Sequence, residues 1–279
     1  MISPFINILI LNWNGQKVLF DCVQSILQSD YKKYCITIID NGSTDSSLES
    51  ITALNSDIIN FIKINQNVGY AKAYNYAFEK IINNKDDFYF ILNNDTVIES
   101  NTLSQLILAL NKYGDNNIFG PKIINFFDGT IWYAGGALNP YTFSANNIGI
   151  NKIDIMTEYK TGKTDFVSGC SLFIKKDILN KIGGFNKIYR FYYEDVDLCL
   201  RAKSLNVNSF FVNNSLVKHK ISHSMGGRYS ILKFYLKTVS KIKFIFSNNS
   251  FFKSILYLLI NILLLPFFLF YKIITILLK

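Results

Sequence analysis

A single carboxylate, Asp95, stands directly after an apolar run that is typical of a buried strand. Residues 88–92 are aromatic and aliphatic, and Asn93, Asn94 and Asp95 follow them. In an open α/β sheet, ligands bind beyond the carboxyl ends of the strands, so a carboxylate there is well placed to hold a metal ion or a substrate. The alternative is an Asx-type turn, in which these side chains only satisfy backbone groups.

Two adjacent carboxylates, Glu194 and Asp195, follow three aromatic residues at the expected start of a helix. Burial beside aromatic rings raises the pKa of a carboxylate and makes it a better base. We therefore predict that this pair serves as a catalytic base. Acidic residues are also favoured in the first turn of a helix by its dipole, which could account for both and for Asp197. We expect Asp197 to cap the helix or to face solvent.

The two histidines of the chain, His219 and His223, follow the last expected strand. A metal ion held by Asp95 would need further protein ligands, and imidazole is a suitable one. We favour His219 because it is closer to the strand. The alternative for both histidines is a surface position without a ligand role.

An alternation of short strands and helices would position these side chains. We expect strands at residues 6–11, 35–39, 60–64 and 88–92, with helices at about 16–28, from about 46, and from 70 to about 83. This pattern is typical of βαβ units and a parallel sheet, in which the strand ends lie along one edge. Polar residues follow all four strands, namely Asn12 and Asn14, Asp40 to Asp45, Asn67 and Gly69, and Asn93 to Asp95. We expect them to converge on one cleft.

The segment 114–165 is punctuated by glycine and proline, which predicts an irregular excursion of short strands at about 122–126 and 130–134. Regular structure should resume with a strand that ends at residue 175. A helix at 176–182 then ends at Gly183 and Gly184, since glycine suits a helix end. The last strands are expected at 209–212 and 216–217.

Charge divides the chain after Asp197, its last acidic residue. Residues 1–197 carry 17 basic and 20 acidic side chains, and residues 198–279 carry 12 basic and no acidic ones. The basic residues alternate with apolar runs, which fits an anionic membrane surface better than nucleic acid. We therefore divide the chain into a domain at 1–227 and a helical, membrane-associating tail at 228–279, with Lys233, Lys237 and Lys241 on one helical face. Pro266 and Lys272 favour interfacial attachment, whereas a membrane-spanning helix or pairing of two chains are the alternatives.

The four cysteines have no metal-type spacing, and no signal peptide precedes the first strand. We expect reduced thiols and a location at the cytoplasmic face of the cell membrane.

Six short motifs occur in a characteristic order and spacing: IDNGSTD at 39–45, NVGYA at 67–71 with Asn75, LNNDT at 92–96, FVSGC at 166–170, IGGF at 182–185 and YEDVDL at 193–198. Each is weakly specific alone, but together they are strongly specific. Over residues 6–227 the chain resembles the inverting family 2 glycosyltransferases, within them the branch that includes bacterial rhamnosyltransferases of cell-surface polysaccharide synthesis.

This resemblance implies a GT-A fold, a Rossmann-like mixed α/β sheet flanked by helices, and a nucleotide-diphosphate sugar donor such as dTDP-rhamnose or a UDP-sugar. Asp40 would contact the base, and the rest of the donor site would include Asn12, Asn14, Asp45, Asn67, Gly69, Asn93 and Asn94. Residues 93–95 stand where the family carries an Asp-x-Asp metal motif, although the first acid is Asn93 here. Asp95 and His219 would bind Mg²⁺ or Mn²⁺.

By the same resemblance, Asp195 would be the general base of a direct, inverting displacement, and Glu194 would support geometry or acceptor binding. The acceptor would be a glycan or a lipid-linked sugar. Two other functions stay open. A sugar-phosphate nucleotidylyltransferase would need a glycine-rich phosphate loop after the first strand, where residues 11–15 hold a single glycine. A non-catalytic, membrane-bound scaffold that binds the nucleotide sugar would not need the carboxylates.

Overall fold

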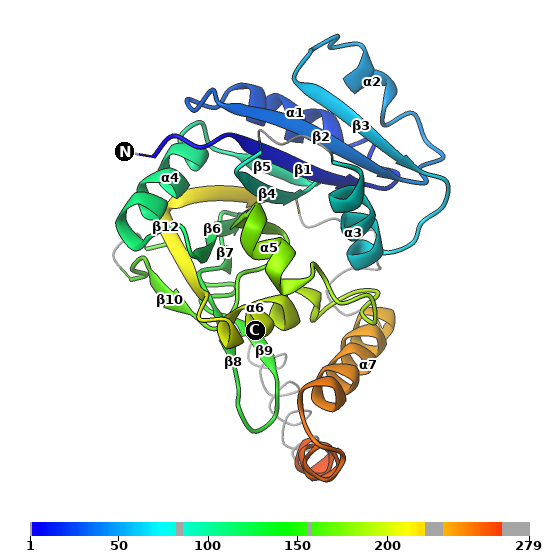
Figure 1. Ribbon diagram of the computed structural model, residues 1–279, viewed down its shortest axis with the longest axis vertical. Helices are drawn as coiled ribbons and strands as arrows, with labels where there is room; N and C mark the ends of the chain where they lie inside the picture. The colour runs from blue at the N-terminus through cyan, green and yellow to red at the C-terminus, as the bar shows by residue number, and fades with distance from the viewer. Residues whose placement is uncertain (1, 82–85, 156–157, 221–230, 264–279) are drawn as a thin grey trace.

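The computed structural model describes residues 2–81, 86–155, 158–220 and 231–263, and its described elements form a large sheet flanked by helices (Figure 1). The strands are β1 Ile6–Asn12, β2 Tyr34–Asn41, β3 Ile59–Ile64, β4 Phe88–Asn93, β5 Thr96–Ile98, β6 Asn117–Asn125, β7 Ile131–Tyr133, β8 Gly136–Leu138, β9 Ala145–Asn147, β10 Gly162–Thr164, β11 Ser171–Lys175 and β12 Asn208–His219. The labelled helices are α1 Leu19–Leu27, α2 Glu49–Thr52, α3 Tyr70–Lys80, α4 Thr102–Tyr113, α5 Lys176–Ile182, α6 Glu194–Ser204 and α7 Ile231–Asn248.

The main sheet has the strand order β10-β12-β6-β11-β4-β1-β2-β3, with β5 paired to β12 and β7 paired to β6. Strand β1 is parallel to both β2 and β4, and β2 is parallel to β3. Strand β11 runs antiparallel between β4 and β6. The sheet is therefore mixed, and the ends of β1, β2, β3 and β4 lie along one edge, as the βαβ pattern predicts.

The central strands are apolar because they are covered on both faces. Strands β1, β2 and β4 are buried along nearly their whole length, whereas β3, at the end of the strand order, is partly exposed. Continuous apolar runs are typical of parallel strands that are covered on both sides. The expected positions of the first four strands are confirmed to within two residues, and helix α5 has the expected bounds.

Three elements differ from the expectation. Helix α1 begins at Leu19 rather than near residue 16, because Gly15 accepts hydrogen bonds from the amides of Val18 and Leu19 in a preceding turn. The second helix is a single short turn, α2. The last two expected strands are one strand, β12, whose pairing with β6 is irregular between Val212 and Leu216.

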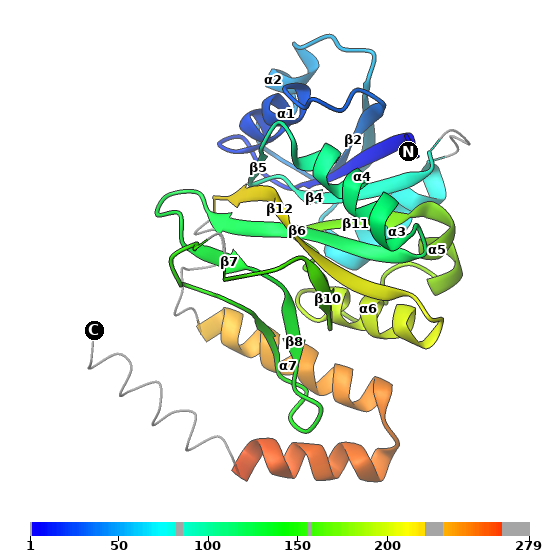
Figure 2. The same ribbon diagram turned by 90° about the vertical axis from the view of Figure 1, so that its left-hand side faces the viewer.

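The irregular excursion between α4 and α5 is confirmed. It contains β6 and β7 of the main sheet and a separate hairpin, β8 with β9, that projects from the body of the molecule (Figure 2). The hydroxyl of Tyr193 donates to the carbonyl of Phe143 over 2.9 Å and so ties this excursion to the start of α6.

The described part of the tail consists of α7 and a second helix at 251–263, which run back along one another below the sheet (Figure 2). Phe244 is fully buried and packs against Tyr193 with ring centres 5.2 Å apart. In the second helix, Asn261 donates to the carbonyl of Thr142. The boundary at 227/228 and His223 lie outside the described residues. Within the described residues, no helix combines the length and apolar character that a membrane crossing requires.

Candidate active site

The polar residues at the ends of β1 and β2 form one network of hydrogen bonds. The side-chain oxygen of Asn14 accepts from the backbone amide of Thr44 over 2.8 Å, and Asp45 accepts from the amides of Gln16 and Ser47. Asp40 accepts from the amide of Ser43. These contacts join the loops that follow β1 and β2, so both loops are fixed relative to the sheet edge.

Asn12, which we predicted to line the donor site, is fully buried. Its amide group donates to the hydroxyls of Ser43 and Ser47, and its oxygen accepts from Asn94 over 2.8 Å. Because its polar atoms are held by these partners, its side chain links three loops instead of facing the cleft. In the structure Asn12 therefore supports the residues around the cleft, and its contact with the donor stays a prediction.

Two glycines make close turns in the same loops. Gly42 has a φ of +76°, and a Cβ atom there would lie 2.6 Å from the Cα of Gln66. Gly69 has a φ of +85° and precedes α3, and its amide donates to the side chain of Asn67. L-residues rarely adopt such backbone angles, so glycine is required at these turns.

Asp95 and His219 meet because β12 pairs with β5. His219 lies opposite Thr96 in this pairing, and the amide of Lys220 donates to the Asp95 carbonyl. Nε2 of His219 lies 3.1 Å from Oδ1 of Asp95, and both side chains are largely buried. Burial opposes the charged imidazolium, but Cys170 and the Asp95 carboxylate outweigh it and raise the pKa of His219 well above its usual range.

Asp195 is held at the start of α6 by two backbone amides. Gly169 donates to one carboxylate oxygen and Val196 to the other, each over 2.8 Å. Tyr192 and Tyr193 immediately before it both have a φ of +68°, which is unusual for residues with a side chain. The backbone therefore turns sharply where it presents Asp195 and Glu194. Burial raises the pKa of Asp195, and the two amides and the charge of Lys237 oppose that shift.

Glu194 is the more strongly perturbed member of the pair. Burial, together with the neighbouring charge of Asp195, raises its pKa to about 8, and its buried Oε2 has no hydrogen-bond partner among the described residues. At neutral pH Glu194 is therefore largely protonated, and the two backbone amides and the charge of Lys237 favour the charged form of Asp195. Of the two, Asp195 is the side chain that can accept a proton.

The burial of Glu194 predicts a pH-dependent stability difference between the wild type and Glu194→Gln. The folded protein holds the Glu194 proton up to about pH 8, whereas the unfolded chain releases it near the ordinary value of 4.5. Stability of the wild type should therefore fall between these pH values relative to the variant, by a few kcal/mol in all, and the difference should level off above about pH 8. Urea denaturation of both proteins from pH 5 to 9 measures this. Parallel stability curves would contradict the burial of a protonated Glu194.

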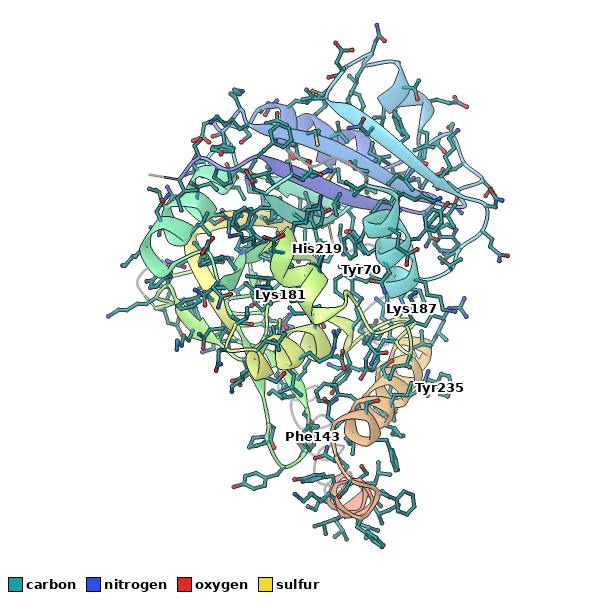
Figure 3. All side chains as sticks on the ribbon, in the orientation of Figure 1. Tyr70, Phe143, Lys181, Lys187, His219 and Tyr235 are labelled. Atoms are coloured by element: carbon teal, nitrogen blue, oxygen red, sulfur yellow. The ribbon has the colours of Figure 1, made fainter. Side chains whose placement is uncertain are left out.

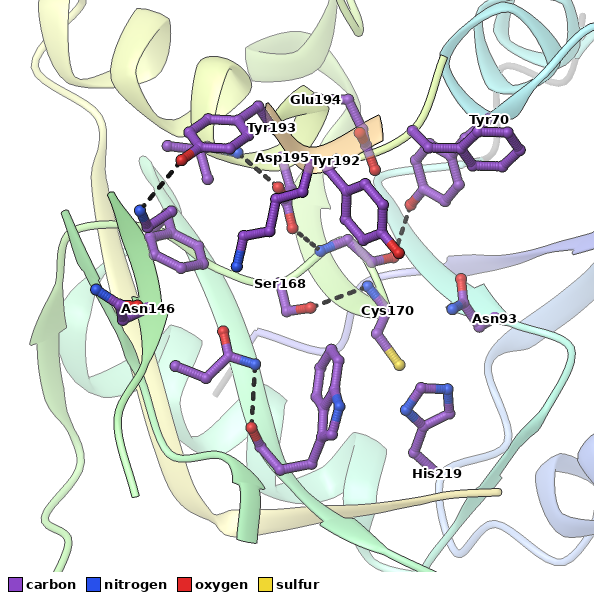
Figure 4. A pocket seen from close by; sticks show the side chains of 18 of the residues that line it. Tyr70, Asn93, Asn146, Ser168, Cys170, Tyr192, Tyr193, Glu194, Asp195 and His219 are labelled. Atoms are coloured by element: carbon purple, nitrogen blue, oxygen red, sulfur yellow. Dashed lines mark hydrogen bonds between the residues drawn. The ribbon is translucent and has the colours of Figure 1, made fainter. Parts of the chain in front are cut away.

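One pocket of about 560 Å³ joins these groups. Figure 4 shows Glu194 and Asp195 on one side of it and His219 on the other, with Cys170 between them. Five predicted site residues line it: Asn93, Asp95, Glu194, Asp195 and His219. The other seven, Asn12, Asn14, Asp40, Asp45, Asn67, Gly69 and Asn94, are not among its described lining residues and belong to the neighbouring loops.

The pocket is also lined by residues that we did not predict to belong to the site. Tyr70 donates to the carbonyl of Gly169 over 2.6 Å, and Trp132 packs edge-on against His219 with ring centres 5.0 Å apart. Lys233 and Lys237 of α7 line the pocket as well. Tyr70 and Gly169 stand inside two of the quoted motifs. Trp132 lies in the irregular excursion, where no periodic pattern marks it.

One of our two expectations for Asp197, that it faces solvent, is wrong. Its side chain is 2% exposed and forms an ion pair with Arg201, one turn further along α6, over 2.7 Å. Arg201 also donates to the carbonyls of Ile182 and Gly184. This pair therefore joins α6 to the end of α5 and supports the element that carries Asp195.

The mixed sheet and the pocket at its strand ends are those of a GT-A-type protein. The chain belongs to glycosyltransferase family 2, because residues 7–183 match the model of the family described as "Glycosyl transferase family 2". It is 25% identical over 224 residues to a glycosyltransferase of Rickettsia typhi, a match that covers 78% of this chain and 64% of that protein. It is 22% identical over 217 residues to the N-acetylglucosaminyl-diphospho-decaprenol L-rhamnosyltransferase of Mycobacterium tuberculosis, covering 68% of each. The chain thus spans slightly less than two thirds of the length of the Rickettsia typhi relative.

Solved structures share the fold at lower identity. The mannosyltransferase PcManGT from Pyrobaculum calidifontis, in complex with GDP-Man and Mn²⁺, aligns with a TM-score of 0.64 and 13% identity over 92% of this chain and 69% of that one. GalNAc-T7 with UDP, GalNAc and Mn²⁺ aligns with a TM-score of 0.65 and 16% identity over 78% of this chain and 44% of that one. Both likenesses support the GT-A fold.

Proposed function

We propose that this protein transfers a sugar, with inversion, from a nucleotide-diphosphate sugar to a glycan or lipid-linked acceptor. One observation carries the proposal: Asp195, fixed by two backbone amides, shares a pocket with the Asp95–His219 pair at the strand ends. A direct displacement requires that the base and the donor-binding residues lie in the same pocket. Similarity to the mycobacterial rhamnosyltransferase supports a dTDP-rhamnose donor, and the UDP-bound neighbour supports a UDP-sugar as the second choice.

In this mechanism Asp195 takes the proton from the acceptor hydroxyl as that oxygen attacks the anomeric carbon. The bond from the anomeric carbon to the diphosphate breaks on the opposite side, so the configuration inverts. Asp195 is suited to this step because its carboxylate is oriented before substrate binds. The neighbouring Glu194, largely protonated at neutral pH, can donate a hydrogen bond to the acceptor without competing for its proton.

The residues at the other side of the pocket fit a divalent cation. Asp95 and His219 are largely buried, and Nδ1 of His219 has no hydrogen-bond partner among the described residues. Asp95 offers an oxygen ligand, and His219 offers a nitrogen ligand once a bound cation displaces the proton that its raised pKa retains. Within the part of the chain that the structure describes, no cluster of three or more His, Cys, Asp or Glu residues could hold a metal ion by itself. Such a pair suits Mg²⁺ or Mn²⁺, which commonly take one or two protein ligands and complete their shell with phosphate oxygens and water. When bound, the cation would stabilise negative charge on the leaving diphosphate.

A thermal-shift panel tests the donor site. UDP, GDP and dTDP, and nucleotide sugars built on them, are added to the full chain with Mn²⁺, with Mg²⁺ or with a chelator. We expect one nucleotide to stabilise the protein in the presence of a cation, by about 2.7 kcal/mol at a hundred times its dissociation constant. No stabilisation by any nucleotide would contradict the proposal.

We also propose that the tail attaches the protein to an anionic membrane surface, at the cytoplasmic face. Apolar side chains are exposed on both tail helices, among them Tyr235 at 61%, Phe251 at 65% and Phe252 at 85%, and Tyr235 lies on the outer side of α7 (Figure 3). The sequence from residue 198 onward carries 12 basic and no acidic side chains. An apolar face with cationic flanks is complementary to anionic lipid.

Phe252→Ser is expected to weaken binding to phosphatidylcholine vesicles that contain phosphatidylglycerol by about tenfold, because burial of a phenylalanine in an apolar phase contributes roughly 1.5–3 kcal/mol. Co-sedimentation measures the bound fraction. The control is Phe127→Ser, which removes a ring that is 76% exposed on the β6–β7 turn and should leave binding unchanged. Equal effects of both variants on vesicle binding would contradict attachment through this tail. The same holds if the wild type forms dimers in the absence of lipid and Phe252→Ser abolishes them.

A further inference from the structure

Two of the lysines of α7, Lys233 and Lys237, face the candidate active site rather than the outer surface of the tail. Lys233, Lys237, Ser240 and Phe244 follow one another at intervals of four, three and four residues, so they share one face of the helix. Ser240 and Phe244 are buried, and the hydroxyl of Ser240 donates to the carbonyl of Phe191 over 2.7 Å. These contacts fix the rotation of α7, and Lys233 and Lys237 therefore line the pocket.

The two lysines stand on the side of the pocket that holds the proposed base. Phe191, to which α7 is bonded, lies four residues before Asp195, and the charge of Lys237 lowers the pKa of Asp195. The loops that follow β1, β2 and β3, where we expect the nucleotide, do not contribute to the described lining of this pocket. A base must contact the acceptor hydroxyl. The lysines therefore face the part of the pocket that the acceptor enters.

A third lysine on the helix, Lys241, has a structural role away from the base. Lys241 donates to the hydroxyl of Ser144 over 2.8 Å and to the side chain of Asn261, and burial, with Lys237 nearby, lowers its pKa to about 8. It connects the β8–β9 hairpin region to the second tail helix. Lys237 is exposed at the pocket and Lys233 is partly exposed, so an incoming ligand can reach both.

We propose that Lys233 and Lys237 form a phosphate-binding subsite for the acceptor, which is therefore a sugar that carries a phosphate or diphosphate close to the accepting hydroxyl. Side chains four residues apart on a helix are separated by roughly 5–6 Å at Cβ, so both can contact one diphosphate group. Ammonium groups bind phosphate as compact charges with several donors. A lipid-diphosphate sugar fits in particular, because the same helix presents exposed apolar side chains on its other side. This inference rests on the proposed glycosyl transfer.

Inorganic pyrophosphate, titrated calorimetrically into the full chain with a chelator present, tests the subsite. We expect Lys233→Gln/Lys237→Gln to weaken its binding by at least about tenfold, since each lysine supplies a charge-assisted hydrogen bond. The matched control, Lys243→Gln/Lys253→Gln, removes two exposed lysines of the same tail and should alter binding less than about twofold. Unchanged thermal unfolding of both variants shows that the fold is intact.

Other sources of the anion predict other patterns. Asp95→Ala should leave the binding of pyrophosphate in the presence of a chelator unchanged. Loss of this binding in Asp95→Ala, and not in the lysine variant, would place the anion at the donor end of the pocket and overturn the proposal. An equal loss in the control, or no binding by the wild type, would also overturn it. If the lysines instead contact lipid headgroups, the double variant loses vesicle binding and keeps pyrophosphate binding. The thermal-shift panel of nucleotides measures binding at the donor site independently. Failure of the phosphate-subsite proposal can therefore be distinguished from failure of the proposed glycosyl transfer.

Discussion

Asp195→Asn is expected to lower the rate of sugar transfer by about 10²- to 10⁴-fold, the usual contribution of a positioned general base. The asparagine oxygen can still accept the hydrogen bond from Gly169 or Val196, so the shape of the pocket is kept while the proton acceptor is lost. The dissociation constant of the donor nucleotide should stay within about twofold of its wild-type value. The measurement is release of nucleoside diphosphate from the donor, with binding read by calorimetry.

The paired variant Glu194→Gln separates the roles of the two carboxylates. A glutamine can replace the hydrogen bond of a protonated Glu194, so its activity should fall far less than that of Asp195→Asn. The opposite order would transfer the role of base to Glu194. Loss of nucleotide binding in Asp195→Asn would instead mean that Asp195 supports the donor site.

The second large effect is expected at the other side of the pocket, where Asp95→Ala should abolish cation-dependent stabilisation by the donor nucleotide. Asp95 is the carboxylate that the β12–β5 pairing brings to His219, and two protein ligands leave no substitute once the acid is removed. The wild-type shift of about 2.7 kcal/mol at a hundred dissociation constants should fall toward zero in the presence of Mn²⁺. Asp57→Ala, which removes an exposed carboxylate near the start of β3, is the charge-matched control. Full cation-dependent stabilisation in Asp95→Ala would exclude Asp95 as the metal ligand.

Much of the fold follows from local sequence patterns. The continuous apolar runs of β1, β2 and β4 are typical of buried strands in a sheet that is covered on both faces. Gly183, with a φ of +82°, ends α5 where a residue in that conformation is needed. The pairing of β12 with β5 is different, because it joins residues more than a hundred positions apart. The sequence therefore predicts His219 as a ligand from its residue type, its place beside the last strand and the family resemblance, whereas the contact with Asp95 depends on the folded sheet.

The side-chain environment was harder to predict than the elements. Asn12 stands after a strand like the other polar residues, yet partners from two other loops bury it completely. The four-residue spacing of Lys233 and Lys237 correctly marks one helical face, but which surface that face meets depends on the packing of Ser240 and Phe244. Spacing within a helix carries no information about its neighbours.

The most direct test of the central claim follows the donor by proton NMR while the full chain acts on it with Mn²⁺, using the nucleotide sugar selected by the thermal-shift panel and water as the acceptor. We expect nucleoside diphosphate to be released and the first sugar formed to have the inverted anomeric configuration, with both products forming about 10²- to 10⁴-fold more slowly in Asp195→Asn. A retained anomer would contradict direct displacement assisted by Asp195. Release of nucleoside monophosphate together with sugar 1-phosphate, or an unchanged donor, would contradict glycosyl transfer and favour cleavage of the diphosphate or a binding role.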